Sequence, residues 1–510
     1  MKKLICLLLS VLLAATLFVA CSEPPEDTSS ESSKAVESNE SEITEESDTT
    51  STDDSTDPYT NDDGRYINSN EIIDWGGREF SIIVRGTAAA TYQSDDFTTG
   101  SELYGELLDT AVTNRNNTIE QMYNVKLKIY KSDAVGSDPI LSNIRDDITG
   151  STTLYDAIMP TIPALAALAK EGNLIDLGTL DYIHLDAPWY DANATNTFSI
   201  GYQYFFTTGD ITILNKVCSG GMLFSKEIIA TRGLDDPYEL VRNHEWTYDK
   251  MKQMAKEATK DTDGIDGMTG ADTWGMLSSH ADALGFYGAA GQLLCKKNAN
   301  DYPYLAFGDE TTMTIAQKII NDMIEENTWI VYAQDFEEPI WVTSLDAFKE
   351  GRVLFRPSAF SATTKLRIAG TDFGIVPMPL WSTEQDDYCT FCGTGETAGI
   401  AISIGCADEE FSAYMIEAIS CESKNFITPA YVEINLKGKD MQDEDSLEML
   451  NLIFGNIIYD TGDVYRFGSI NTLFTNLVAA KKSNLASTFE SQKGAIEDAI
   501  ESLIDSYNAG

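Results

Sequence analysis

Residues 155–172, YDAIMPTIPALAALAKEG, place a short apolar run directly in front of a helical pattern. Residues 155–159 are apolar enough for a buried strand, and residues 164–171 follow with helical spacing before Gly172, which closes the helix. A strand that leads at once into a helix is the repeating unit of a parallel sheet flanked by helices. The stretch therefore predicts an α/β fold.

The same alternation is found upstream of this stretch. Residues 78–85 and 125–130 have strand patterns, and residues 103–123 and 140–148 carry apolar side chains at helical spacing. Ligands of such sheets bind beyond the carboxyl ends of the strands, so we expect the functional site there.

Downstream, the pattern is less regular. The clearest helix start is at residues 245–251, where Thr247 can cap the helix and Trp246 and Met251 can form a hydrophobic staple. Another helix is expected to end at residues 346–351, and the chain from Asp440 onward is mostly helical by periodicity. Further strands are predicted at residues 202–208, 222–224, 352–355, 373–376 and 398–404.

The N-terminus is predicted to be a signal peptide, residues 1–20. Lys2 and Lys3 precede an apolar run that is short for a membrane span and has no basic cluster behind it. The run ends in FVAC, which resembles the lipobox of bacterial lipoproteins, although Phe18 stands where that motif prefers Leu. The resemblance implies that Cys21 receives a diacylglycerol and anchors the protein to the outer face of the cell membrane. An ordinary leader with an incidental cysteine is the alternative.

Residues 21–63 read as a stalk that follows this anchor. From Ser22 to Asp63 the chain consists almost entirely of Ser, Thr, Asp and Glu, with Lys34 as its only basic residue. Such a segment buries too little apolar surface to offset chain entropy, so we expect disorder. Its contour of roughly 140 Å is enough to hold a domain away from a cell surface.

Composition narrows the function of the remaining residues, 64–510. They are numerous enough for two lobes with separate cores. The formal net charge of the whole chain, −46, argues against nucleic acid as a partner, because phosphate binding requires a basic surface. It also disfavours binding to an anionic membrane surface, and it suits an acidic extracytoplasmic protein.

Cysteine spacing leaves several interpretations open. Cys389 and Cys392 have C-x-x-C spacing, and Cys406 and Cys421 follow. A redox pair or a metal site can use this spacing, but the spacings do not repeat as in a zinc ribbon and no βαβ context marks a thioredoxin-like site. Free thiols or a structural disulfide are therefore favoured.

Residues 236–251, DPYELVRNHEWTYDKM, resemble the extracellular solute-binding proteins of ABC importers, family 1, the sugar-binding lipoprotein type. Four other segments agree with this family in order along the chain. They are residues 155–159, 188–190, 348–354 and 374–377.

The resemblance implies a two-lobed periplasmic-binding-protein-like fold of type II, with hinge strands between the lobes. Lobe 1 would comprise residues 64–213 and 376–435, and lobe 2 residues 214–375 and 436–510. It further implies a carbohydrate ligand, an ABC permease as partner, a monomer, no catalysis and no cofactor.

Carbohydrate sites stack sugar rings on aromatic faces and bind hydroxyls with charged and amide groups. Arg356 and Glu396 also match ligand segments of the family. The alternatives are that a loop aromatic packs on its own lobe, that Thr161 only caps a helix, and that Glu396 lies in a surface turn. The predicted ligand-binding residues are Thr161, Trp189, Tyr190, Asp210, Trp341, Arg356, Phe360, Trp381, Tyr388 and Glu396.

Asp261, Asp263, Asp266 and Asp272 cluster as the ligands of a calcium ion would, because a hard cation prefers many oxygens. The segment does not follow the EF-hand pattern, since Asp266 stands where that loop needs glycine. A structural calcium ion and an acidic surface turn are both compatible with the pattern.

Other reaction classes find little support. Residues 393–398 fit G-x-G-x-x-A, but a predicted strand rather than a helix follows them, and the chain contains neither H-E-x-x-H nor G-x-S-x-G. An exported glycoside hydrolase remains an alternative, because paired carboxylates are recognised only in space. Binding of a peptide or polyamine, or a sensory role, is the other alternative.

Overall fold

The computed structural model describes residues 58–88, 90–133, 140–325, 328–436 and 444–508. The predicted signal peptide, Cys21 and most of the predicted stalk lie outside these ranges. Thr56–Gly510 forms one compact unit. Within the described ranges, no helix combines the length and the apolar character needed to cross a bilayer.

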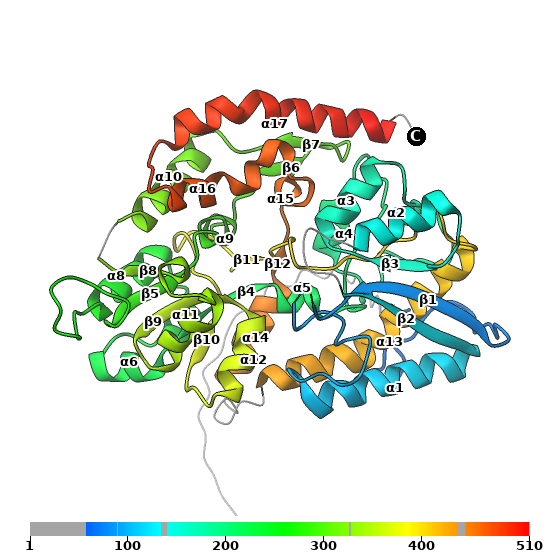
Figure 1. Cartoon of the computed structure of the whole chain (residues 1–510), viewed down its shortest axis with the longest axis horizontal. Coiled ribbons are helices and arrows are strands. Elements are labelled where there is room, and N and C mark those ends of the chain that lie inside the picture. The colour runs from blue at the N-terminus through cyan, green and yellow to red at the C-terminus, as the bar shows by residue number, and fades with distance from the viewer. Residues whose placement is uncertain (1–57, 89, 134–139, 326–327, 437–443, 509–510) are drawn as a thin grey trace, which may run out of the picture. The chain divides into compact units, whose positions relative to one another are not determined.

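One sheet has three parallel strands in the order β2-β1-β3 (Figure 1). Its strands are β1 (Arg78–Arg85), β2 (Val125–Ser132) and β3 (Ala157–Met159). Both faces of β1 contribute to a core: Phe80, Ile82 and Val84 share a core with α1 (Gly105–Tyr123) and α13 (Glu409–Leu436), while Ile83, on the more polar face, joins the core of α2 (Ile140–Gly150) and α3 (Ile162–Lys170). Since successive strand residues point to opposite faces, helices cover both sides of this sheet.

The second sheet is mixed and has five strands in the order β10-β4-β9-β5-β8. β5 is parallel to β8 and β9, whereas β4 is antiparallel to β9 and β10. Its bounds are β4 (Gly220–Phe224), β5 (Trp274–Ser278), β8 (Ile330–Tyr332), β9 (Val353–Ala359) and β10 (Gly374–Val376). The helices packed on it include α8 (Tyr248–Ala258), α11 (Ile340–Lys349) and α12 (Phe360–Ile368).

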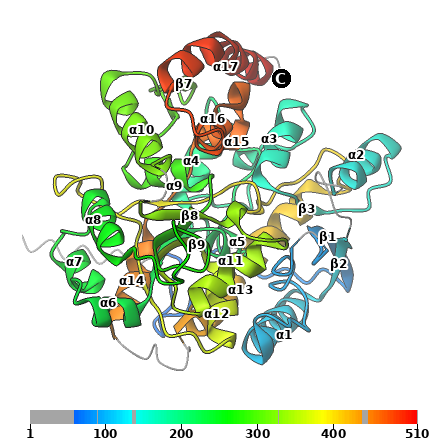
Figure 2. The same cartoon turned by 60° about the vertical axis from the view of Figure 1, so that its left-hand side comes forward.

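A third group of helices lies above both sheets in Figure 1 and at the top of Figure 2. It comprises α10 (Glu310–Met323), α15 (Thr461–Tyr465), α16 (Leu473–Ala479) and α17 (Leu485–Asn508), with the hairpin of β6 (Cys295–Lys297) and β7 (Pro303–Leu305). α9 (Asp282–Ala289) contacts α10 and α16 and lies closer to the second sheet (Figure 2). The smaller elements are α4 (Ala192–Phe198), α5 (Leu214–Val217), α6 (Lys226–Arg232), α7 (Pro237–Arg242), α14 (Glu444–Gly455), β11 (Thr390–Phe391), β12 (Ile457–Ile458), and the 3-10 turns η1 (Leu177–Thr179), η2 (Ala333–Asp335) and η3 (Phe467–Thr472).

The predicted start of α8 is confirmed. The Thr247 side chain accepts a hydrogen bond from the backbone N–H of Lys250, and Trp246 and Met251 are fully buried. This is the expected N-cap arrangement, which satisfies an otherwise unpaired donor of the first turn.

Two predicted strands, residues 202–208 and 398–404, are wrong as regular strands. The second segment is extended but forms only isolated bridges, with Ile400 paired to Thr207 and Ala401 to Ile158. This segment passes between two other segments of the chain. Its apolar residues are therefore buried, although they do not belong to a regular β-ladder. Tertiary packing here overrides the local pattern.

The cysteines in the described part of the chain are free thiols. Cys389 and Cys392 are not bonded to each other, and burial raises the pKa of both, that of Cys392 to about 12. A catalytic C-x-x-C pair requires a lowered pKa, so this segment lacks the electrostatics of a redox site.

Candidate functional site

A cavity of about 690 Å³ lies at the carboxyl ends of the parallel strands β5 and β9. This is the edge of the sheet where the sequence predicted a site. Ser278 ends β5, Arg356 lies on β9, and Trp341 and Lys365 come from α11 and α12. Segments of the first sheet's side of the unit also line it, through Ala90, Tyr92 and Glu396.

A second cavity of about 380 Å³ adjoins the first, and both are lined by Ala281, Asp282 and the backbone of β9 from Pro357 to Ala359. It is also lined by the loop 393–395 and by Arg466, which follows α15. We refer to the two cavities together as the cleft. Residues from distant parts of the chain line the cleft, so its walls can contact one ligand from several sides.

Arg356 is the most unusual residue of the cleft. Its side chain is only 6% exposed, and its Nε has no hydrogen-bond partner among the described residues. Burial lowers the pKa of its guanidinium to about 10, although the nearby charge of Asp282 opposes this effect. The group therefore stays protonated at neutral pH and has donors that the protein leaves unsatisfied.

Asp282 begins α9 and is held by its own neighbours. Its Oδ2 accepts hydrogen bonds from Ser278 Oγ at 2.8 Å and from the Ser279 N–H at 2.7 Å. Burial raises the pKa of this carboxyl, and these hydrogen bonds and Arg356 oppose the increase. Asp282 is thus fixed at the wall of the cleft rather than free to move toward a ligand.

Two aromatic side chains face the larger cavity. Trp341, in the first turn of α11, is 55% exposed and so leaves a wide apolar surface open to the cavity. Tyr92 is half-buried on the side of the first sheet. An exposed indole beside hydrogen-bond donors can bind a ring that has an apolar face and a polar rim.

Glu396 is positioned by the first sheet. Arg85, at the end of β1, donates from Nη1 to Glu396 Oε2 at 2.9 Å, and Gln93 Nε2 donates to the Glu396 carbonyl at 3.1 Å. The Glu396 side chain remains about half exposed, so it keeps an accessible oxygen in the cavity.

Of the residues predicted from sequence, the structure brings Trp341, Arg356 and Glu396 together in the cleft. Tyr92, Asp282, Lys365 and Arg466 also line it but were not predicted. Asp282 begins a helix after a short turn that follows the end of β5, and this strand-to-helix position is the sequence signal that could have identified it.

The other predicted ligand residues lie away from the cleft lining. Trp189 is fully buried, and Tyr190 is buried with its hydroxyl donating to Glu417 at 2.6 Å. Thr161 is the buried N-cap of α3, and Phe360 is buried against Phe454.

Two further aromatic residues that were predicted to bind ligand contact α7, α8 and the neighbouring loops instead. Trp381 stacks on Tyr248 with ring centroids 5.6 Å apart, and Tyr388 lines a separate pocket beside α7, where its hydroxyl donates to the Val241 carbonyl. Both aromatic residues therefore pack against the α7–α8 part of the chain, which the predicted boundaries assign to the other lobe, and neither lines the cleft.

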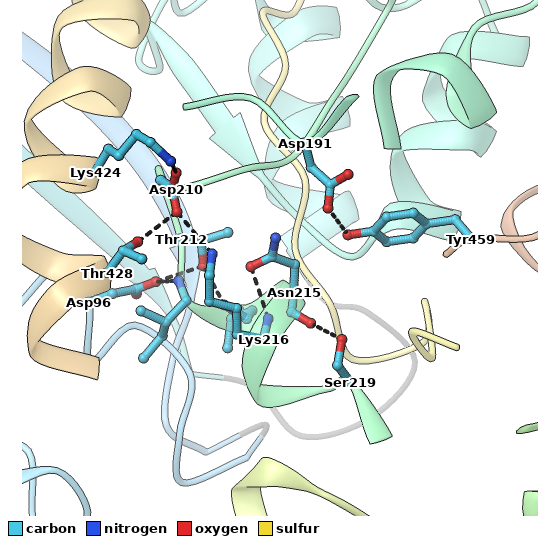
Figure 3. A network of polar contacts seen from close by, with 12 residues as sticks. Asp96, Asp191, Asp210, Thr212, Asn215, Lys216, Ser219, Lys424, Thr428 and Tyr459 are labelled. Atoms are coloured by element: carbon cyan, nitrogen blue, oxygen red, sulfur yellow. Dashed lines mark hydrogen bonds and ion pairs between the residues drawn. The ribbon is translucent and has the colours of Figure 1, made fainter. Parts of the chain in front are cut away.

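Asp210 is the centre of a buried polar network (Figure 3). Its carboxylate accepts from Lys216 Nζ and Lys424 Nζ, both at 2.9 Å, and from Thr428 Oγ1 at 2.6 Å. Burial raises its pKa, but the two ammonium groups outweigh burial and hold the pKa at about 2. The network ties α5 to α13, so Asp210 has a structural position rather than a place in the cleft.

Asp261, Asp263 and Asp272 lie close enough to share one ion, whereas Asp266 is not part of this group. Asp272 already accepts backbone N–H groups of Thr262, Asp263 and Thr269, and these hydrogen bonds lower its pKa to about 2. An acidic turn stabilised by its own backbone accounts for the cluster, and calcium binding stays a prediction.

Comparisons with known proteins place the fold. No protein-family model and no curated protein sequence matches the chain. Solved structures do match it. A cyclo/maltodextrin-binding protein complexed with maltotetraose aligns over 84% of this chain and 97% of its own, with a TM-score of 0.53 at 11% identity.

Two more matches are similar in extent. An ABC transporter solute-binding protein from Thermotoga lettingae, bound with α-D-tagatose, aligns over 83% of this chain and 100% of its own, with a TM-score of 0.52 at 13% identity. An ABC substrate-binding protein from Listeria monocytogenes, in complex with cycloalternan, aligns over 85% and 99%, with a TM-score of 0.51 at 10% identity.

The chain therefore has the two-lobed, periplasmic-binding-protein-like α/β fold of solute-binding proteins, which confirms the predicted fold class. The resemblance found in the sequence is confirmed at the level of the fold. The residue boundaries of the two lobes stay a prediction.

Proposed function

We propose that this protein is the solute-binding component of an ABC importer and that the cleft captures a sugar or oligosaccharide. The observation that carries this proposal is the combination of the exposed Trp341 face and the unsatisfied Arg356 donors in one cavity of about 690 Å³. That volume suits a small oligosaccharide, and the two groups match the apolar face and the polar rim of a sugar ring.

The proposed mechanism is closure around the ligand. Trp341 and Arg356 belong to the five-stranded sheet and its helices, while Tyr92 and Glu396 come from the side of the three-stranded sheet. A ligand that contacts both groups stabilises the closed arrangement, because it gains the second set of contacts only there. The closed form would then deliver the sugar to the permease.

The proposed location follows from the N-terminus. Lipidation of Cys21 and cleavage of residues 1–20 would leave the folded unit on the outer face of the cell membrane, carried by residues 21–63. A metabolic label with a fatty-acid analogue, lost in Cys21→Ser, tests this part independently of ligand binding.

One observation favours a second candidate, an exported glycoside hydrolase. Burial raises the pKa of Asp282 in a cleft that also contains Glu396, and an acid of raised pKa opposite a carboxylate is a requirement of glycoside hydrolysis. Ser278 and Ser279 already bind the Asp282 carboxylate, which weakens the case for the hydrolase.

A thermal-shift screen of the purified protein against neutral and acidic oligosaccharides, with peptides and polyamines in parallel, tests the proposal. A ligand at about a thousand times its Kd adds about 4 kcal/mol to the native state, which raises Tm measurably. Recovery of the stabilising glycan intact supports a binding protein, and its cleavage supports the hydrolase. A shift by peptide or polyamine alone would overturn the sugar assignment.

A further inference from the structure

We propose that the cleft selects oligosaccharides that carry anionic groups, carboxylate or sulfate, and that Arg356 and Lys365 bind the anion. This inference rests on the proposed function and specifies the substrate class of the same site. It arises because the cations that line the cleft lack ion-pair partners, whereas the acids that line it accept hydrogen bonds from the protein.

The cations of the cleft are not paired by the protein. Arg356 is more than nine-tenths buried, and among the described residues none forms an ion pair with it or accepts a hydrogen bond from its Nε. Lys365 and Arg466 are exposed in the cleft, and neither has an ion pair with any residue in the described ranges.

The acids of the cleft, in contrast, are satisfied by protein donors. Asp282 accepts from Ser278 and Ser279, and Glu396 is paired with Arg85 at 2.9 Å. Asp463 accepts from Thr394 Oγ1 at 2.6 Å and from Asn471 Nδ2 at 3.3 Å. The lining therefore offers free positive donors and few free negative acceptors.

This imbalance is unexpected from the composition. Acidic residues outnumber Lys and Arg by 81 to 35 in the whole chain, so a cation has many carboxylates available as partners. Elsewhere Lys216, Lys252 and Lys297 are each paired with an acid. The carboxylate of Asp282 lies near Arg356 but forms no ion pair with it. Leaving a buried arginine without an ion-pair partner costs stability, and such a cost is typical of positions reserved for a ligand.

The chemistry of the Arg356 guanidinium indicates which kind of ligand group it would bind. Its planar donors match the two oxygens of a carboxylate or of a sulfate, and such charge-assisted bonds are stronger than those to neutral hydroxyls. An anionic sugar would supply the ion-pair partner that Arg356 lacks while its ring contacts the Trp341 face. Lys365, on the neighbouring helix, adds a second positive charge to the same cavity.

Isothermal titration calorimetry with trigalacturonate and its fully methyl-esterified form tests the inference, because the two differ in charge but hardly in shape. We expect the ester to bind at least about tenfold more weakly. Raising the salt concentration from about 0.05 M to about 0.5 M should weaken only the charged ligand. Sulfated disaccharides and free sulfate form two further arms.

Variants identify the residues responsible. Arg356→Gln and Lys365→Gln should each reduce trigalacturonate affinity toward that of the ester, while Arg232→Gln, an exposed arginine on α6, should leave it unchanged. Lys365 is exposed, so its replacement tests the inference even where Arg356→Gln folds poorly.

Each outcome separates the two proposals. Tight binding of sulfated sugars instead of uronates identifies sulfate as the anion and supports the inference. Equal or tighter binding of neutral oligosaccharides, or an equal response to free sulfate, overturns the inference and leaves the sugar-binding proposal intact. Failure of every oligosaccharide to bind overturns both.

Discussion

Arg85 and Glu396 form an ion pair of 2.9 Å between the end of β1 and a loop more than three hundred positions later in the chain. The Arg85 side chain is only 10% exposed, while that of Glu396 is 52% exposed. This pair fixes the orientation of Glu396 in the cleft and neutralises its charge. Arg356, on the opposite wall, has no such partner among the described residues, so the two arginines have different roles.

Replacing Glu396 by Gln keeps its shape and removes its charge. We expect affinity for an anionic oligosaccharide to rise by about threefold or more, because one like charge leaves the cleft and Arg85 becomes available to the ligand. Titration calorimetry measures the change. Glu497→Gln, an exposed position on α17, should have no effect. A drop in affinity for acidic and neutral sugars alike would instead identify Glu396 as a hydroxyl-binding residue.

Trp341 is expected to contribute to binding without contributing to stability. Trp341→Ala should weaken sugar affinity by about tenfold or more, since an aromatic face on a sugar is worth on the order of 1–2 kcal/mol. Because the side chain is 55% exposed, the unfolding free energy should change by less than about 0.5 kcal/mol. Tyr304→Ala, at an aromatic position 44% exposed on β7 and outside the cleft lining, is the matched control. Unchanged affinity in Trp341→Ala would contradict the proposed site.

The free cysteines give a prediction about reactivity. Burial raises the pKa of Cys392 to about 12 and of Cys406 to about 11, so at pH 7 only about 1 in 10⁴ or fewer of these groups is a thiolate. We expect slow labelling by thiol reagents in the native protein, rapid labelling after unfolding, and no effect of reductant on Tm. A Cys389–Cys392 disulfide detected by mass spectrometry would count against this account.

Local signals predicted those elements whose structure is decided locally. The strand pattern of β1 and the cap at Thr247 are properties of a few neighbouring residues, and the structure confirms both. Residues 398–404 lie between distant segments, so their sequence indicated burial but could not indicate which ladder they join.

The residues of the site also divide into those that local sequence can indicate and those that only the folded structure brings together. Arg356 was predicted because it follows a strand pattern and matches a ligand segment of the family, and Trp341 because an aromatic residue outside the expected strands can stack on a sugar. Tyr92 reaches the cleft only because segments far apart in sequence meet there, and no local pattern encodes such a meeting. Lys365, in contrast, is on α12, which directly follows β9 and Arg356, so its place near the cleft is a local one that the sequence analysis missed. Trp189 illustrates the converse, since exposure could not be read from the sequence and this tryptophan is fully buried outside the cleft lining.

Asp210 should stabilise the fold above pH 4. Asp210→Asn leaves Lys216 and Lys424, both largely buried, without their counter-charge, so we expect a loss of about 3–5 kcal/mol at pH 7. The folded pKa of about 2 lies below the unfolded value, so this stabilisation is present above the unfolded pKa and is lost as pH falls toward 2. Urea unfolding at several pH values should therefore show the wild type and Asp210→Asn converging in acid, while Asp498→Asn on exposed α17 follows the wild type throughout. Parallel curves for wild type and Asp210→Asn would refute the assignment.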